Sequence, residues 1–134
     1  MAAVRNLRAW AVVALLALGC GDDFSEEEAP DLASPPGARA VELTIRDGAF
    51  SPAMIEAPSG EWLLVLLRNE SEQLHGFAVE LPNRQLTLAD GISPGGVDHL
   101  GFQAPDAAGE HVFYCPVADH RQRGEEGRLV VMPR

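Results

Sequence analysis

The sequence predicts an all-β fold, an antiparallel β-sandwich or barrel of seven or eight short strands. Three observations lead to this prediction. One run alternates apolar and polar residues, several short apolar runs are separated by turn residues, and no segment has the pattern of a convincing amphipathic helix. The first 38 of the 134 residues have a different composition. We therefore expect the folded domain to cover residues 39–134.

Residues 1–20 have the composition of a signal peptide. Arg5 and Arg8 make its beginning positive, and the apolar run of residues 9–18 is too short to remain in a bilayer as a spanning helix. The sequence Ala-Leu-Gly-Cys that ends at Cys20 resembles the lipobox of bacterial lipoproteins, although Ala stands where Leu is commoner. We expect export to the periplasm or cell envelope with a lipid anchor on Cys20. Ordinary secretion is the alternative.

Residues 21–38 form an acidic segment with little capacity to fold. The stretch DDFSEEEAPDLASPPG holds six acidic residues, three prolines and no basic residue, so it offers too few apolar groups for a core. We expect a disordered tether that holds the domain away from a membrane surface.

The acidity of the chain bears on its partners. The whole sequence has 20 acidic and 10 basic residues, which gives a formal charge of -10 at pH 7. Such a charge repels the phosphate backbone and disfavours nucleic acid as a partner. A basic redox partner protein is compatible with it.

The first predicted strand begins near residue 41. Val41, Leu43 and Ile45 alternate with polar residues, which is typical of a strand with one buried face. The turn signal Asp47-Gly48 follows, and prolines lie near both ends of FSPAMIEAPSG, residues 50–60. These prolines favour a short edge strand or an irregular segment over a helix.

The remaining strands are predicted from apolar runs between turn residues. WLLVLLRN, residues 62–69, begins with six apolar residues and favours a strand that is buried on both faces. Runs of Pro, Gly, Asn and Asp separate five further candidates, which are HGFAVEL (75–81), QLTLA (85–89), VDHLGFQ (97–103), EHVFYC (110–115) and RLVVM (128–132).

Cys115 is the only cysteine outside the predicted signal peptide, so it has no disulfide partner in an exported protein. Its residue type leaves three roles open: buried apolar residue, reactive thiol or metal ligand. It shares a strand face with Phe113 and is expected to point inward. His120 follows five residues later, and His75 begins another strand. Two imidazoles and a thiolate can thus meet at one end of the sandwich, and this donor set suits copper.

These stretches resemble the cupredoxins, the family of single-domain blue copper proteins of the plastocyanin and azurin type. FYCPVADHRQRGEEGRLVV is similar to the last two strands of that family, and LRNESEQLHGFAV to the strand with the first copper-binding His. The resemblance covers residues 41–132. It implies a Greek-key antiparallel β-sandwich that binds one copper ion, with His75, Cys115 and His120 as equatorial ligands.

The sequence departs from the family pattern at the axial position. The family commonly has Gly-Met-x-Gly there, with a weakly bound Met sulfur, and this chain has Gly-Glu-Glu-Gly at residues 124–127. The resemblance places Glu125 as the axial ligand, a hard anionic group that favours Cu(II), lowers the reduction potential and makes zinc more competitive. Alternatively, Glu125 points into solvent or pairs with Arg121 or Arg123, and the carbonyl of Leu74 caps a three-coordinate site.

The leading functional hypothesis is an outer-sphere electron carrier in which His120 is the electron port. A copper-binding or delivery module without a redox partner is the alternative, and a structural sandwich that has lost its metal is the third reading. Cys115 is the only Cys in its loop, which excludes the binuclear copper centre of cytochrome oxidase subunit II, and the lack of His-x-His pairs argues against a multicopper oxidase. No group for chemistry on a small-molecule substrate is apparent, so we expect no enzyme. We expect His111 to be a hydrogen-bonded interior residue and His99 to be exposed.

Overall fold

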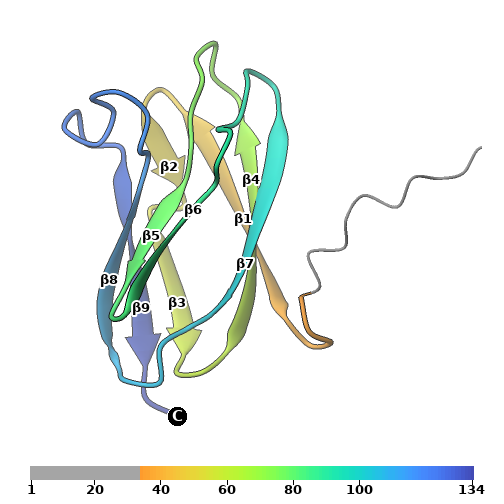
Figure 1. Ribbon diagram of the computed structural model, residues 1–134, viewed down its shortest axis with the longest axis vertical. Helices are drawn as coiled ribbons and strands as arrows, with labels where there is room; N and C mark the ends of the chain where they lie inside the picture. The colour runs from red at the N-terminus through yellow and green to blue at the C-terminus, as the bar shows by residue number, and fades with distance from the viewer. Residues whose placement is uncertain (1–33) are drawn as a thin grey trace, which may run out of the picture.

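The computed structural model describes residues 34–134, which form nine strands in two sheets (Figure 1). The predicted signal peptide with Cys20 and the tether up to residue 33 lie outside the described residues, so export and lipidation stay predictions. Within the described part of the chain, the structure holds no helix with the length and hydropathy that a membrane span requires.

The first sheet has the strand order β2-β1-β4-β7. Its centre is the parallel pair of β1 (Arg39–Arg46) and β4 (Trp62–Asn69). The short β2 (Ala49–Ser51) and the longer β7 (Val97–Gln103) are the antiparallel edge strands. In β4 every second side chain is fully buried, because one face of this sheet covers the core while the other is only partly covered.

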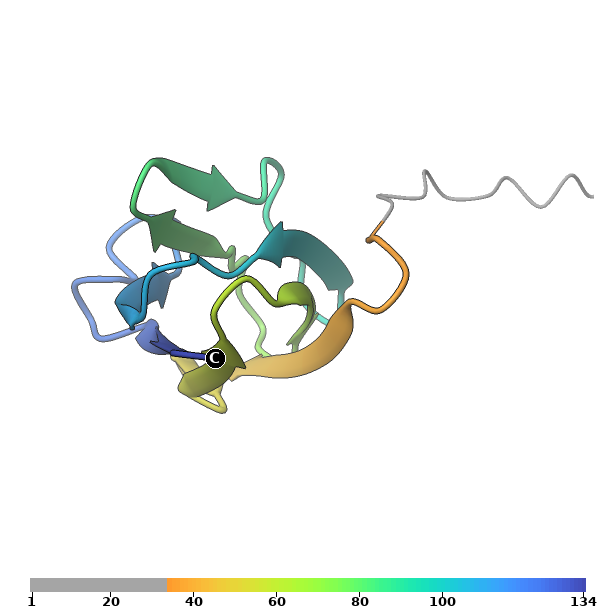
Figure 2. The same ribbon diagram turned by 90° about the horizontal axis from the view of Figure 1, so that it is seen from below.

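The second sheet has the strand order β3-β9-β8-β5-β6. The edge strand β3 (Met54–Pro58) runs parallel to β9 (Glu126–Met132). The other neighbours are antiparallel, and they comprise β8 (Gly109–Tyr114), β5 (Ala78–Leu81) and β6 (Arg84–Thr87). Figure 2 shows the two sheets as curved layers around a common interior.

The predicted all-β sandwich is confirmed, but three details differ. The segment 50–60 forms two strands, β2 and β3, each of which is an edge strand of a different sheet. The chain therefore changes sheets there, which gives nine strands and two parallel pairs instead of a purely antiparallel fold. The prediction that residues 62–69 are buried on both faces was wrong, because Leu64 and Leu66 are only half-buried.

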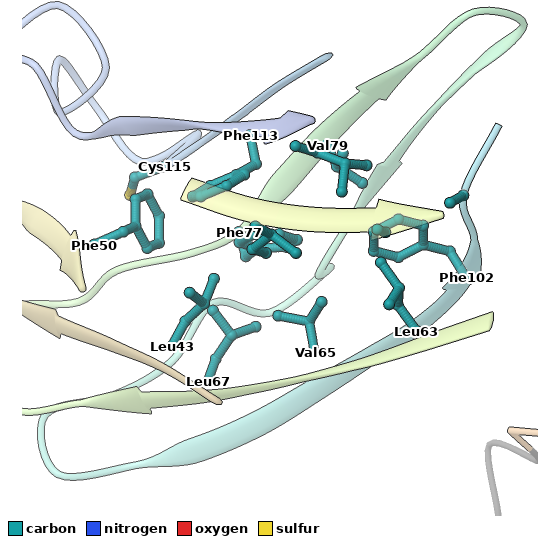
Figure 3. Close-up of a cluster of buried hydrophobic side chains, with 14 of the residues drawn as sticks. Leu43, Phe50, Leu63, Val65, Leu67, Phe77, Val79, Phe102, Phe113 and Cys115 are labelled. Carbon is teal, nitrogen blue, oxygen red and sulfur yellow. The ribbon is translucent and has the colours of Figure 1, made fainter. Parts of the chain in front are cut away.

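The core lies between the two sheets, and Cys115 stands at one end of it (Figure 3). Three phenylalanine rings fill the interior beneath this cysteine. The ring of Phe113 lies 5.3 Å from that of Phe50 and 5.5 Å from that of Phe77, measured between centroids. Edge-on and tilted contacts at such distances are favourable, so the rings form a packed floor under the end of the sandwich where Cys115 lies.

Two histidines stand apart from this end. His111 on β8 is half-buried, and its Nε2 has no hydrogen-bond partner among the described residues, so the predicted hydrogen bond is not present at that nitrogen. His99 on β7 has a side chain that is 39% exposed and lies beside Asp98. The prediction that His99 faces solvent is therefore correct in part.

Candidate metal centre

His75 lies just before β5 and is held by its backbone. It forms an isolated antiparallel bridge with Ile92, in which the His75 N–H donates to the Ile92 carbonyl at 3.2 Å and the Ile92 N–H donates back at 2.6 Å. The residue is 2% exposed. The two reciprocal hydrogen bonds therefore fix the backbone position from which the imidazole extends at the end of the sandwich.

The side chain of Asn69, at the end of β4, fixes the segment that leads to His75. Its amide nitrogen donates to the carbonyls of Gln73 at 2.7 Å and Ile92 at 2.8 Å. Its oxygen accepts from the backbone N–H of Ser71 at 2.9 Å and from the Ser71 hydroxyl at 2.8 Å. A fully buried amide with its hydrogen bonds made is a rigid clamp. Sequence reasoning treated Asn69 only as a strand-ending residue and missed this role.

Cys115 directly follows β8 and is 1% exposed. The backbone N–H of Gly76 donates to its Sγ at 3.3 Å. Burial raises the pKa of the Cys115 thiol above its ordinary value, whereas hydrogen bonds from the backbone of Val117 and Gly76 act in the opposite direction. Without a cation nearby the sulfur therefore favours the neutral thiol, and a bound metal ion would stabilise the thiolate.

The loop between β8 and β9 brings two more donors to this cysteine. The N–H of Cys115 donates to the Glu125 carbonyl, and the N–H of Glu125 donates to the His120 carbonyl, each at 3.1 Å. Gly124 has a φ of 98°, a left-handed conformation that favours glycine, and it turns the chain just before Glu125. The loop thus folds back on itself, and both His120 and Glu125 are buried.

The structure brings together all four residues that were predicted to form the metal site. Cys115 Sγ lies 3.5 Å from His120 Nδ1 and 3.9 Å from His75 Nδ1. The two carboxylate oxygens of Glu125 lie 2.6 Å from His75 Nδ1 and 3.5 Å from His120 Nδ1. The four donor atoms lie within 4.8 Å of one another, and each residue is buried. We call His75, Cys115, His120 and Glu125 the donor group.

The position of Glu125 excludes two alternatives that the sequence left open. The residue is 1% exposed, so it does not point into solvent. Arg121 instead pairs with Glu80 at 2.8 Å, and Arg123 pairs with Asp119 at 2.9 Å. The carboxylate instead faces the imidazoles of His75 and His120.

The chemistry and the spacing of the donor group fit one transition-metal ion. Ligand bonds of about 2.0–2.3 Å to a shared ion place neighbouring donors roughly 3.5 Å apart, close to the two separations between sulfur and nitrogen. Imidazole and thiolate suit copper and zinc, whereas magnesium and calcium prefer oxygen donors. The donor group could therefore hold a single copper ion. Without a bound ion, these four ionisable side chains would be buried together at a considerable desolvation cost.

Comparisons with known proteins agree with this fold. The family model of the cupredoxin-like domain matches residues 10–131, so the chain belongs to the cupredoxin-like family. A search among curated protein sequences gave no match.

Solved structures with a similar fold include blue copper proteins. The dithionite-reduced auracyanin of the photosynthetic bacterium Roseiflexus castenholzii is 20% identical with a TM-score of 0.61, and the match covers 72% of this chain and all of the auracyanin. Auracyanin A, a blue copper protein of Chloroflexus aurantiacus, is 18% identical with a TM-score of 0.60 and the same coverage. A blue copper oxidase of Nitrosomonas europaea is 21% identical with a TM-score of 0.60, over 72% of this chain but 39% of the oxidase. At these identities the likeness is one of fold.

Proposed function

We propose that this protein binds one copper ion and carries electrons by outer-sphere transfer in the cell envelope. The observation that carries the proposal is the buried donor group of two imidazoles, one thiol and one carboxylate within 4.8 Å. His75, Cys115, His120 and Glu125 would hold this ion. Copper bound there supplies a one-electron change between Cu(II) and Cu(I).

The surroundings of the donor group favour electron transfer because they resist rearrangement. His75 is held by the bridge to Ile92, and Cys115 accepts a hydrogen bond from Gly76. Contacts of this kind in the surroundings of a metal orient its ligands and tune its properties. Donors that keep their positions in both oxidation states keep the barrier to electron transfer low.

His120 is the electron port in this proposal. His120 is 7% exposed, whereas Cys115 and Glu125 are each 1% exposed. A partner that docks over this end can therefore come closest to the donor group through the His120 imidazole. The formal charge of -10 favours a partner with a basic surface.

Two further parts of the proposal rest on the sequence. The signal peptide pattern and the lipobox-like end at Cys20 support export and a lipid anchor. The chain carries one Cys and no His-x-His pair in its domain, which supports a carrier without a catalytic reaction. Glu125 favours a second candidate, copper binding or delivery without redox cycling, because a hard carboxylate disfavours reduction to Cu(I).

Copper loading of the exported full-length protein tests the function. We expect an intense thiolate-to-copper absorption band and a reversible voltammogram. Cys115→Ser should abolish the band completely, because the sulfur that gives rise to it is removed. Cys20→Ser is the matched control, and it should keep the band while it moves the protein from the membrane fraction to the soluble fraction.

Each alternative has its own outcome. Copper binding without reversible cycling would favour the delivery function. A band that persists in Cys115→Ser would refute the assigned site, and failure of the unsubstituted protein to bind copper would leave only a structural sandwich.

A further inference from the structure

A polar cavity opens directly onto the donor group. It has a volume of about 600 Å³ and lies between the β1–β2 turn, the segment after β4 and the loop between β8 and β9. These segments lie at the same end of the sandwich in Figure 1. The residues that line the cavity are Asp47, Gly48, Glu70, Ser71, Glu72, Gln73, His75, His120, Arg123 and Glu125.

The rim of this cavity is acidic. Glu70 pairs with Arg46, and Arg123 pairs with Asp119, so these charges are compensated. Asp47 and Glu72 are exposed, and no ion pair to either is present among the described residues. Asp47 interacts electrostatically with the same Arg46 that pairs with Glu70, so the carboxylates at the mouth of the cavity outnumber the cations and leave a negative potential there.

The floor of the same cavity is formed by metal-binding groups. Three of the four residues of the donor group line it, and only Cys115 does not. The His120 side chain is 8% exposed, and its Nδ1 lies 3.5 Å from Glu125 Oε2. Glu125 faces the β1–β2 turn, since a Cβ built on Gly48 would lie 4.0 Å from Glu125 Oε2. Thus acidic side chains at the rim lead to buried imidazoles at the floor.

The other sides of the donor group are closed. The packed phenylalanine rings lie beneath it, with Phe50 and Phe113 5.3 Å apart. On the side of Gly76 the chain packs against Pro116 so closely that a Cβ on this glycine would lie 3.1 Å from the proline Cδ. Access from those directions would require the core or the loop to separate.

We propose that this cavity is the route by which the copper cation reaches the donor group, and that Asp47 and Glu72 draw the cation toward it. The proposal rests on the copper-binding function proposed above. A cleft lined by one sign of charge raises the local concentration of counter-ions and increases association rates by about 10- to 1000-fold. The negative rim makes the route selective for cations and unfavourable for anionic ligands.

Copper loading kinetics test this route. Purified apoprotein is mixed with the aqua ion of Cu(II) alone, and the growth of the charge-transfer band is followed by stopped flow. The double variant Asp47→Asn and Glu72→Gln should bind copper on the order of ten times more slowly at an ionic strength of about 0.01 M. Asn tolerates left-handed backbone, so the Asp47 φ of 52° can be kept.

A matched control removes the same charges at the opposite end. Asp106→Asn with Glu110→Gln makes the same two chemical changes at exposed positions. Glu110 lies five residues before Cys115 on β8, roughly 16 Å away at the rise of a strand. This control should load several times faster than the variant at the cavity, because its two charges lie farther from the route.

The salt dependence and the final spectrum complete the test. The difference between the two double variants should disappear near 1 M salt, where the screening length is about 3 Å, and both should reach the same final spectrum. Equal loading rates at low salt, or equal slowing in the control, would overturn the route while leaving the copper site intact. Failure of the unsubstituted protein to develop the band would overturn the proposed function, and the route with it.

Discussion

The two ends of the sandwich differ in where they place polar side chains. At one end, Asn69, His75, His120 and Glu125 are all buried, and these are the buried polar side chains of the described residues. The opposite end also has a cavity, of about 390 Å³, but its polar lining residues are exposed. Water solvates the polar groups there, whereas at the first end the protein itself must satisfy them.

This difference is the reason why we assign the proposed function to the first end. Burial of an ionisable group without compensation is unfavourable, and a structural sandwich has no need for such a group. Four of them converge at one end, next to an amide clamp that orders the adjacent segment. The contrast predicts that substitutions at the two ends have different effects on stability and on copper, and the following changes test it from the largest effect to the smallest.

The largest effect on stability is expected for Gly127→Ala on β9, beneath the donor group. The new Cβ would lie 2.2 Å from Phe113 Cζ and 2.5 Å from the Ala53 carbonyl oxygen. Overpacking of this kind destabilises by about 1–3 kcal/mol, and the lack of free space places this change at the upper end. Phe113 lies two residues before Cys115, so the copper absorption should shift as well. Urea unfolding of the apoprotein measures the first effect.

A second variant shows whether this clash is the cause. Phe113→Leu removes the ring atoms that the new Cβ would meet. The loss of unfolding free energy in the double variant should therefore be smaller than the sum of the losses in the two single variants. Additive losses would indicate that Gly127 matters for a different reason.

Asn69→Ala should have the next largest effect. It removes the amide that satisfies the carbonyls of Gln73 and Ile92, and loss of a buried hydrogen-bond partner costs about 1–3 kcal/mol. The segment before His75 should loosen, so hydrogen exchange at the Ser71 amide should accelerate and the copper absorption should broaden. An unchanged midpoint of urea unfolding would show that the Asn69 side chain does not contribute to stability.

Glu125→Met replaces a hard anionic donor by a soft neutral one. The reduction potential should rise, because Cu(II) loses its preferred ligand; a tenfold change in the relative affinity for Cu(II) and Cu(I) corresponds to about 59 mV for one electron. Glu126→Met is the matched control, since the neighbouring residue is only half-buried and contacts Arg121 and Arg128. Voltammetry that gives the same potential for both variants would remove Glu125 from the ligand set.

The smallest effect is expected away from the donor group, at His111. Its Nε2 is buried and has no hydrogen-bond partner among the described residues. His111→Phe should raise the free energy of unfolding by about 1 kcal/mol, because no polar atom is left without a partner. The copper spectrum and the potential should stay unchanged. A shifted spectrum would mean that a substitution far from the donor group alters the copper site, contrary to the difference between the two ends of the sandwich.

The agreement between sequence and structure is closest where a pattern is local. Strand β4 has the predicted bounds of residues 62–69, and His75, Cys115 and His120 were proposed from strand ends and a short loop. Glu125 was named only through the resemblance to the cupredoxins. The strands in segment 50–60 were harder to predict, because they belong to different sheets and each is too short to show a periodic pattern. The parallel pairing of β1 with β4 and of β3 with β9 has no local signature either.

By itself, the sequence determined the fold class, the positions of most strands along the chain and the chemical types of the donors, because hydrophobic period, turn residues and residue identity are properties of short stretches. Only the tertiary structure decided that Glu125 points inward, that Asn69 clamps the segment before His75, and that an acidic cavity opens onto the donor group. The physical reason is that burial, hydrogen bonding and electrostatic potential depend on neighbours that are distant in the chain. The carboxylate of Glu125 meets an imidazole 50 residues away, and no local pattern encodes that distance.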